Sequence, residues 1–162
     1  MTAKQKNRPI LVPVDFSSHS EAAMVCAAEL AESLGSTLVI LHVVHDPGEA
    51  PGYYSIKGRG KQLRRMEDVA AEMLDDYSRK MQNKHSGLPA LKDATTMLVV
   101  GLPVNRILES AEKIHASMII MSSQGRTGLA HVLLGSKAEQ VVRLAPLPVM
   151  IVKDKKETKN LK

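Results

Sequence analysis

The sequence predicts an α/β fold in which strands and helices alternate along the chain. Five short stretches are apolar almost throughout, and such continuous apolarity is typical of strands buried on both faces of a parallel sheet. These stretches are residues 10–14, 37–44, 95–100, 117–121 and 148–152. Helix-like segments separate them, at 19–34, 61–83, 104–115 and 136–144. The strict alternation predicts right-handed crossovers and an open sandwich with helices on both faces of the sheet.

Several residues mark the expected ends of these helices. Two serine–glutamate pairs have the spacing of a capping box, in which the serine caps the first turn of a helix. The pairs are Ser18 with Glu21 and Ser136 with Glu139. Pro103 suits the first turn of the third helix, where an N–H group has no partner within the helix. Gly35 is expected to end the first helix, because glycine is the commonest residue just beyond a helix.

Length and composition fit a single domain. The 162 residues, 44% of them hydrophobic, are enough to bury a core of aliphatic side chains. The one cysteine, Cys26, cannot form an internal disulfide, and in a helical pattern it is expected to pack as a small apolar group. We expect a basic flexible tail at 1–7, the domain at 8–153, and a charged flexible tail at 154–162.

The sequence does not predict a membrane or secreted protein. Pro13 and Asp15 interrupt the apolar run near the N-terminus, which leaves it shorter than the core of a signal peptide. No segment approaches the roughly 20 apolar residues of a membrane span. The expected location is therefore the cytoplasm.

The net charge of +5 does not indicate nucleic-acid binding, because most of the excess lies in the two tails. A further basic cluster lies within the chain, at Lys57, Arg59, Lys61, Arg64 and Arg65. Proteins that bind single strands usually add aromatic side chains on which bases stack, and this chain has one Phe, three Tyr and no Trp. The cluster is therefore interpreted as a solvated surface.

The segment 45–60 is rich in glycine and proline and is longer than an ordinary connection. We expect it to be a mobile surface loop, and one hypothesis is that it forms a lid over a ligand.

In an open α/β sheet, ligands bind beyond the carboxyl ends of the strands, so the glycine-rich stretch after 117–121 is a candidate site. It does not match a Walker A loop, because Ser136 and Lys137 stand in the reverse order and the spacing is wrong. A dinucleotide fingerprint requires glycines directly after the first strand, where the sequence reads FSS. A hydrolase elbow centred on Ser123 has Met121 in place of its first glycine, and no triad histidine is evident.

Two interpretations of this stretch remain open. Backbone N–H groups near Gly125, Gly128 and Gly135, with the helix that starts near Ser136, form an anion site in the first. Arg126 would add a donor, and glycine would permit a phosphate to approach closely and the backbone to adopt a positive φ. In the second interpretation, the glycines only shape a turn and Ser136 only caps a helix.

Two histidines, His42 and His45, end the second strand, but no further ligand lies at convincing spacing for a metal site. We expect a packed His42 and a solvated His45.

Four segments together resemble the universal stress protein family, with a match over about 8–152. They are "PVDFS", "LHVV", "GLP" and "SSQGRTGLAHVLLGSKAEQVVRLAPLPVMIV". Nucleotide-binding members of this family carry the motif G-x2-G-x9-G-[ST]. Gly125, nine residues, Gly135 and Ser136 reproduce its second and third elements, whereas Ser122 stands where the first glycine belongs.

The resemblance implies a Rossmann-like sheet of five parallel strands in the order 3-2-1-4-5, with ATP or AMP bound across the switch between strands one and four. Any metal is then expected to be Mg²⁺ carried by the phosphates of this nucleotide. Asp15 would lie at the adenosine end, the main chains of Pro13 and Val43 would flank the base, and Gly101 would leave space near the sugar. Asp15 and Gly101 also have structural interpretations, as a turn cap and a bend. The residues expected to bind the nucleotide are Pro13, Val14, Asp15, Val43, Gly101, Met121, Ser122, Ser123, Gly125, Arg126, Gly128, Gly135, Ser136 and Lys137.

The leading hypothesis for function is a nucleotide-binding protein that acts as a stress-response sensor or regulator. No general base is evident, so at most slow ATP hydrolysis is expected. The alternatives are a family member that binds no nucleotide and serves as a protein-interaction module, and a small hydrolase. The resemblance also implies a homodimer formed through the last strand, 148–152, because an unpaired apolar edge strand favours association.

Overall fold

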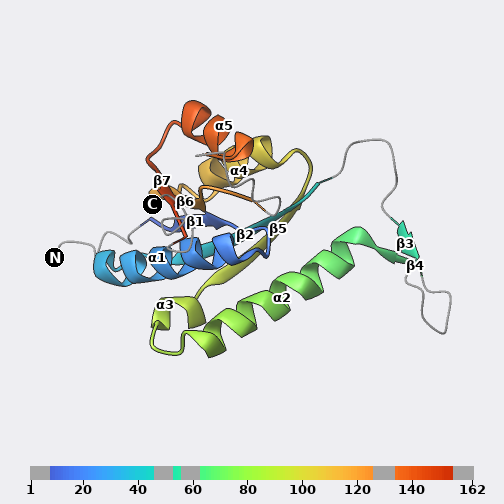
Figure 1. Ribbon diagram of the computed structural model, residues 1–162, viewed down its shortest axis with the longest axis horizontal. Helices are drawn as coiled ribbons and strands as arrows, with labels where there is room; N and C mark the ends of the chain where they lie inside the picture. Colours follow the sequence, from blue (N-terminus) through green and yellow to red (C-terminus); the bar gives the residue numbers. More distant parts are fainter. Residues whose placement is uncertain (1–7, 46–52, 56–62, 126–133, 155–162) are drawn as a thin grey trace, which may run out of the picture.

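The computed structural model describes residues 8–45, 53–55, 63–125 and 134–154, with backbone only at 53–55 and 63–65. Its centre is a five-stranded sheet with helices on both faces (Figure 1). The strands of this sheet are β1 (Ile10–Pro13), β2 (Leu38–Val44), β5 (Thr95–Val100), β6 (Met118–Ser122) and β7 (Val149–Val152). The helices are α1 (Ser18–Leu34), α2 (Met66–Lys84), α3 (Pro89–Lys92), α4 (Pro103–Lys113) and α5 (Ser136–Leu144). The tail expected at 1–7 and nearly all of the tail at 154–162 lie outside the described residues.

The strand order is β5-β2-β1-β6-β7, and every neighbouring pair is parallel. Counted along the chain within this sheet, the order is 3-2-1-4-5, so the predicted fold class is confirmed. The chain moves outward from β1 through β2 to β5, then crosses back to β6 on the other side of β1 (Figure 1). The carboxyl ends of β1 and β6 therefore form the switch point of the sheet, where loops diverge and leave room for a ligand.

The region between β2 and β5 differs from the sequence prediction. The helix expected at 61–83 begins only at Met66, because Leu63–Arg65 forms the short strand β4. This strand pairs antiparallel with β3, Tyr53–Ser55, within the segment expected to be an irregular loop. Strands of three residues carry too little alternation to be recognised from sequence, and the single-turn helix α3 was missed for the same reason. The lid hypothesis concerns mainly residues outside the described part of the chain.

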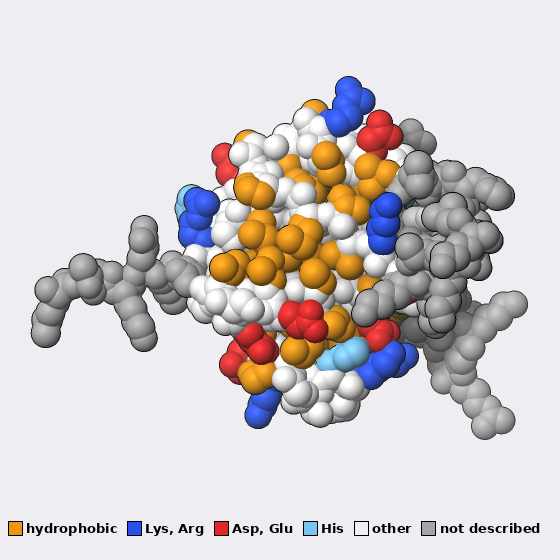
Figure 2. Space-filling model, turned by 60° about the vertical axis from the view of Figure 1, so that its left-hand side comes forward, with side chains coloured by type: hydrophobic (Ala, Val, Ile, Leu, Met, Phe, Trp, Pro, Cys, Tyr) orange, Lys and Arg blue, Asp and Glu red, His pale blue; other side chains and the backbone are white. Residues whose placement is uncertain are grey.

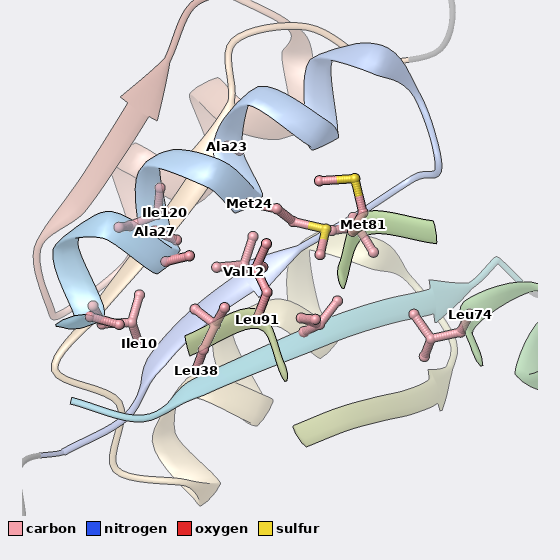
Figure 3. Close-up of a cluster of buried hydrophobic side chains, with 14 residues drawn as sticks. Ile10, Val12, Ala23, Met24, Ala27, Leu38, Leu74, Met81, Leu91 and Ile120 are labelled. Atoms are coloured by element: carbon pink, nitrogen blue, oxygen red, sulfur yellow. The ribbon is translucent and has the colours of Figure 1, made fainter. Parts of the chain in front are cut away.

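Each face of the sheet buries its own hydrophobic cluster. Successive residues of a strand point to opposite faces, so Ile10 and Val12 pack beneath α1, whereas Leu11 packs toward α4 and α5. In the first cluster, Met24 of α1 and Met81 of α2 close over the strands (Figure 3). Full burial of a leucine or isoleucine contributes about 1.5–3 kcal/mol, so both faces favour apolar residues at the buried strand positions. This requirement explains the continuous apolar runs in the sequence.

The single cysteine packs where α1 meets β7. Cys26 is partly buried, and its Sγ lies 4.0 Å from the Sδ of Met150. Burial raises the pKa of the Cys26 thiol, so the reactive thiolate is disfavoured. The structure therefore agrees with an apolar packing role for this residue.

Two of the predicted helix ends are confirmed. Gly35 follows α1 with a φ of 60° and a ψ of 29°, and its N–H donates to carbonyls of the last turn. Pro103 occupies the first position of α4. Within the described part of the chain, none of the helices has a stretch long and apolar enough to cross a membrane.

Gly101, at the turn from β5 into α4, adopts a φ of 141°, a value that residues with a side chain rarely adopt. The side chain of Arg106 lies over it, donating from Nε to the Val100 carbonyl at 2.8 Å and from Nη1 to Glu109 at 2.6 Å. A Cβ placed on Gly101 would come within 2.6 Å of the Arg106 Nε. Glycine is therefore required here by the fold itself.

We expect Gly101→Ala to lower the free energy of unfolding by about 1–3 kcal/mol, because alanine is strained at this φ. Arg106 is flexible and can move aside, so the backbone conformation supplies most of the effect. Gly87→Ala is the matched control, since a Cβ at Gly87 meets no atom within 4 Å and its φ lies outside the positive range that strains alanine. Urea unfolding of both variants checks this expectation, and equal stabilities would contradict it.

Candidate functional site

A cavity of about 420 Å³ opens at the carboxyl ends of β1, β2 and β6, beside the first turn of α5. Its volume lies within the range of small-molecule sites, about 300–1,000 Å³. The lining residues are Pro13, Val14, Asp15, Ser20, Leu41, His42, Val43, His45, Pro103, Ile107, Met121, Ser122, Ser123, Gln124, Gly125, Gly135, Ser136, Lys137 and Ala138. The cavity therefore lies at the switch point of the sheet.

Asp15 organises the turn from β1 into α1. Its Oδ1 accepts hydrogen bonds from the Ser17 N–H at 3.1 Å, the Ser17 hydroxyl at 2.5 Å and the Ser20 hydroxyl at 2.6 Å. The Ser20 hydroxyl in turn accepts from the Asp15 N–H at 3.0 Å. The other oxygen, Oδ2, faces Gly125, where an added Cβ would lie 3.3 Å away. One oxygen of this carboxylate thus stabilises the fold, while the other borders the cavity.

The cap of α1 is Ser17, so the prediction of Ser18 was wrong by one residue. The Ser17 hydroxyl accepts from the Ser20 N–H at 3.2 Å while it donates to Asp15. Ser18 is already in the helix and exposed. Both serines are compatible with a helix start in the sequence, and the contact with Asp15 selects the first of them.

Three aromatic side chains pack together at the turn from β1 into α1. Phe16 has a φ of 64°, which is unusual for a bulky residue. Its ring stacks on His42 with centroids 4.2 Å apart and meets the edge of Tyr77 at 5.4 Å. The Tyr77 hydroxyl donates to the Ser17 carbonyl at 3.4 Å, and burial raises its pKa, so this hydroxyl stays protonated. These contacts hold Phe16 in its strained conformation.

His42 is packed, as predicted, and His45 is exposed. The Nδ1 of His42 lies 2.8 Å from the Val14 carbonyl oxygen, and because a carbonyl only accepts, Nδ1 carries the proton. Among the residues that the structure describes, no three histidine, cysteine or carboxylate side chains group in a way that could hold a metal ion.

The chain beyond β6 is tied to the start of α5. The Ser123 N–H donates to the Val152 carbonyl at 3.0 Å, and the Ser123 carbonyl accepts from the Gly135 N–H at 2.7 Å. The Ser122 hydroxyl donates to the Gln124 carbonyl at 2.8 Å. These bonds bring the two ends of the glycine-rich loop together at the edge of the cavity.

The capping box predicted for α5 is absent. Gly135 is the cap residue, it makes no side-chain cap, and Ser136 is the first helical residue. The first N–H groups of a helix have no partner within it, so this end of α5 carries donors and a partial positive charge at the cavity. Gly135 has a φ of −66°, so the expectation of a positive φ does not hold at this position. Glycine matters there for space, since a Cβ would lie 3.3 Å from the Ser123 carbonyl oxygen.

The structure brings most of the predicted site residues around one cavity. Those on its lining are Pro13, Val14, Asp15, Val43, Met121, Ser122, Ser123, Gly125, Gly135, Ser136 and Lys137. Gly101 is not on the lining, because Arg106 covers it, and Arg126 and Gly128 lie outside the described residues. Sequence reasoning missed Ser20, Leu41, His42, His45, Pro103, Ile107, Gln124 and Ala138 as lining residues. For most of them the only signal was proximity to a strand end or to a helix start, and Leu41 and Ile107, inside β2 and α4, had none.

The chemistry of the lining disfavours a serine nucleophile. Ser123, the centre of the hydrolase-like pattern, is only 1% exposed, so its hydroxyl is not presented to a substrate. Among the described lining residues, Asp15 is the one carboxylate and Lys137 is the one lysine or arginine. The arrangement can accept hydrogen bonds at Asp15 and attract an anion at Lys137 and the start of α5.

Fold and cavity together define an open α/β domain of the doubly wound class, with a small-molecule-sized cavity at its switch point. A model of the universal stress protein family matches residues 6–153. The chain is 30% identical over 153 residues to a universal stress protein of Methanocaldococcus jannaschii, a match that covers 93% of this chain and 84% of the relative. The chain belongs to the universal stress protein family.

Solved structures show the same fold. A universal stress protein from Archaeoglobus fulgidus, in complex with dAMP, matches with a TM-score of 0.62 at 24% identity, covering 92% of this chain and all of that one. A universal stress protein in complex with cAMP matches with a TM-score of 0.65 at 22% identity, covering 91% of this chain and 98% of that one.

We expect Ser17→Ala to lower the free energy of unfolding by about 1 kcal/mol, because it removes both the helix cap and a donor to Asp15. Ser18→Ala is the control, one residue further along, and is expected to change stability by less than about 0.5 kcal/mol. Thermal and urea unfolding of the two variants measure the difference. A larger loss in Ser18→Ala would show that the cap is misassigned.

Proposed function

We propose that the protein binds an adenine nucleotide, ATP or AMP, in the cavity at the switch point and acts as a stress-response sensor or regulator. The observation that carries this proposal is the polarity of the cavity. The Asp15 carboxylate lies beside Gly125 on the lining, and the start of α5 with Lys137 lines the same cavity. The complexes of two structural neighbours with dAMP and cAMP support the same ligand class.

The start of α5 suits a phosphate for two reasons. Its first N–H groups lack helical partners, and the helix dipole and Lys137 both favour negative charge there. Gly135, which carries no side chain, leaves the main chain accessible. We propose that the phosphates lie against Gly135, Ser136 and Lys137.

The adenosine end is proposed to lie near Asp15, Pro13 and Val43. Carboxylate oxygens accept from the amine of a base or the hydroxyls of a sugar, whereas they repel a phosphate. This assignment fixes the direction of the ligand along the cavity.

We propose binding rather than rapid turnover. Asp15 Oδ1 accepts three hydrogen bonds from Ser17 and Ser20, and the Nδ1 of His42 donates to the Val14 carbonyl. These atoms already have partners within the protein and are not placed to activate a water molecule. Mg²⁺ would enter with the phosphates of ATP, because Asp15 is the one carboxylate among the described lining residues.

Calorimetric titration with ATP and with AMP tests this proposal. Wild type is expected to bind, and Gly135→Val is expected to bind at least tenfold more weakly, about 1.4 kcal/mol, because the branched side chain obstructs the approach to the main chain. Gly87→Ala, remote from the cavity, is the control for the loss of a glycine. Wild type that gives no heat with either nucleotide, confirmed by equilibrium dialysis, would refute the proposal.

A protein-interaction role is the second candidate, and the free edge of β7 favours one form of it, a homodimer. The exposed apolar side chains include Val142, 45% exposed, and Leu144, 61% exposed, at the end of α5, and Met150, 40% exposed, on β7. Figure 2 brings the left-hand side of Figure 1 forward, where β7 lies, and hydrophobic side chains gather on this face. We propose that β7 pairs with β7 of a second copy.

The hydrogen-bond register identifies which residues would pair. The N–H groups of Ile119 and Ser123 donate to the carbonyls of Pro148, just before β7, and of Val152, so the backbone groups of these two residues face β6. Alternate residues of a strand direct their backbone groups to opposite sides. Ile151 therefore directs its N–H to the free edge, whereas Met150 directs its N–H toward β6.

We expect light scattering to show a dimer for wild type and a folded monomer for Ile151→Pro, which removes an outward donor and leaves the ladder with β6 intact. Ile151→Ala is the control, because it shortens the same side chain but keeps the N–H, and is expected to remain dimeric. Met150→Pro removes a donor to β6 and is expected to lower the unfolding temperature instead. A monomeric wild type at micromolar concentration would contradict the dimer.

A further inference from the structure

The hydroxyl of Ser122 fixes the peptide group that joins Gln124 to Gly125. Ser122 ends β6, and its Oγ donates to the Gln124 carbonyl two residues further on, at 2.8 Å. The bond is partly buried and closes a small ring at the edge of the cavity. A glycine at position 122 cannot make it.

The preceding peptide group is fixed as well. The Ser123 carbonyl accepts from the Gly135 N–H at 2.7 Å, so two consecutive carbonyls of this loop are held in place. The described residues contain no cis peptide bond, and in a trans peptide the N–H points opposite to the C=O. Because the Gln124 carbonyl points to Ser122, the Gly125 N–H points away from it.

The Gly125 N–H is suited to a ligand. Within the described part of the chain it has no hydrogen-bond partner, and Gly125 lies on the cavity lining. Gly125 has no side chain, and a Cβ added there would lie 3.3 Å from the Oδ2 of Asp15, so this residue lies on the Asp15 side of the cavity.

We infer that Ser122 is a positioning residue, whose hydroxyl orients the Gly125 N–H as a donor to the phosphate nearest the sugar. This inference rests on the proposed nucleotide-binding function. Ser122 itself does not contact the ligand through its hydroxyl proton, since that proton is used by the Gln124 carbonyl. Ser122, which stands in place of the motif's first glycine, thus holds the Gly125 N–H in one orientation, whereas a glycine would leave this peptide group free to rotate.

A purely structural role would affect every ligand of the cavity equally, so ligands that differ only in phosphate separate the two possibilities. The experiment is calorimetric titration of adenosine, AMP and ATP into wild type, Ser122→Ala and Ser122→Thr. We expect Ser122→Ala to weaken AMP and ATP binding about fivefold to tenfold, because one oriented hydrogen bond is lost, and to leave adenosine affinity within about twofold. Ser122→Thr keeps the hydroxyl and is expected to restore AMP affinity to within about twofold of wild type.

Ser117→Ala is the matched control. The Ser117 hydroxyl donates to the Pro9 carbonyl at 3.2 Å next to the opposite end of β6, so its loss removes a bond of the same kind far from the cavity. It is expected to leave all three affinities unchanged. Ser122→Gly, which installs the residue of the family motif, is expected to weaken AMP binding by less than tenfold.

The outcomes are distinguishable. AMP and ATP affinities in Ser122→Ala that match wild type would overturn the role of Ser122 and leave the proposed function standing. An equal loss for adenosine and AMP would also overturn it, because the effect would not depend on the phosphate. Wild type that binds none of the three ligands would refute the proposed function, and the inference with it.

Discussion

The burial of the parallel sheet on both faces is the constraint on which the rest of this structure depends. Strands covered by helices on two sides have no wet face, so polar chemistry is confined to their ends. At the carboxyl ends of β1, β2 and β6 the backbone leaves the sheet, and the cavity forms there. The location of the candidate site is thus a consequence of how the core is packed.

Asp15 shows how closely fold and site are joined at that edge. Its Oδ1 binds the first residues of α1, and its Oδ2 borders the cavity. Removing the carboxylate would disturb the helix start and the site together, so a loss of binding in such a variant would not by itself identify a ligand contact. Variants that change a single bond, away from this carboxylate, are more informative.

The strands and most helices were predictable from sequence because their signal is local and repeated. Where two neighbouring residues suited the same role, sequence spacing failed by one position, as with Ser18 for Ser17 and Ser136 for Gly135. The deciding interactions come from tertiary contacts, with Asp15 in the first case and with the Ser123 carbonyl in the second.

The location of the site and the loops that form it were predictable from sequence, but the side-chain contacts that hold those loops in place were not. The aromatic cluster of Phe16, His42 and Tyr77 joins residues from three distant parts of the chain, and no periodic pattern in the sequence predicts it. The conformation of Gly101 was likewise hidden, because Arg106, which covers it, lies on the following helix. Contacts of this kind require the folded chain.

The bond from the Gly135 N–H to the Ser123 carbonyl has a thermodynamic consequence. It joins the two ends of the loop between β6 and α5, both in the second half of the chain, and Asp15 and Val43 complete the cavity lining from the first half. No local piece of the chain contains the site, so a ligand recognises the native state and has no counterpart of this cavity in the unfolded ensemble. By mass action, any such ligand at a hundred times its Kd would raise the free energy of unfolding by about 2.7 kcal/mol. The melting temperature of the whole domain would then report on occupancy of a cavity at one edge.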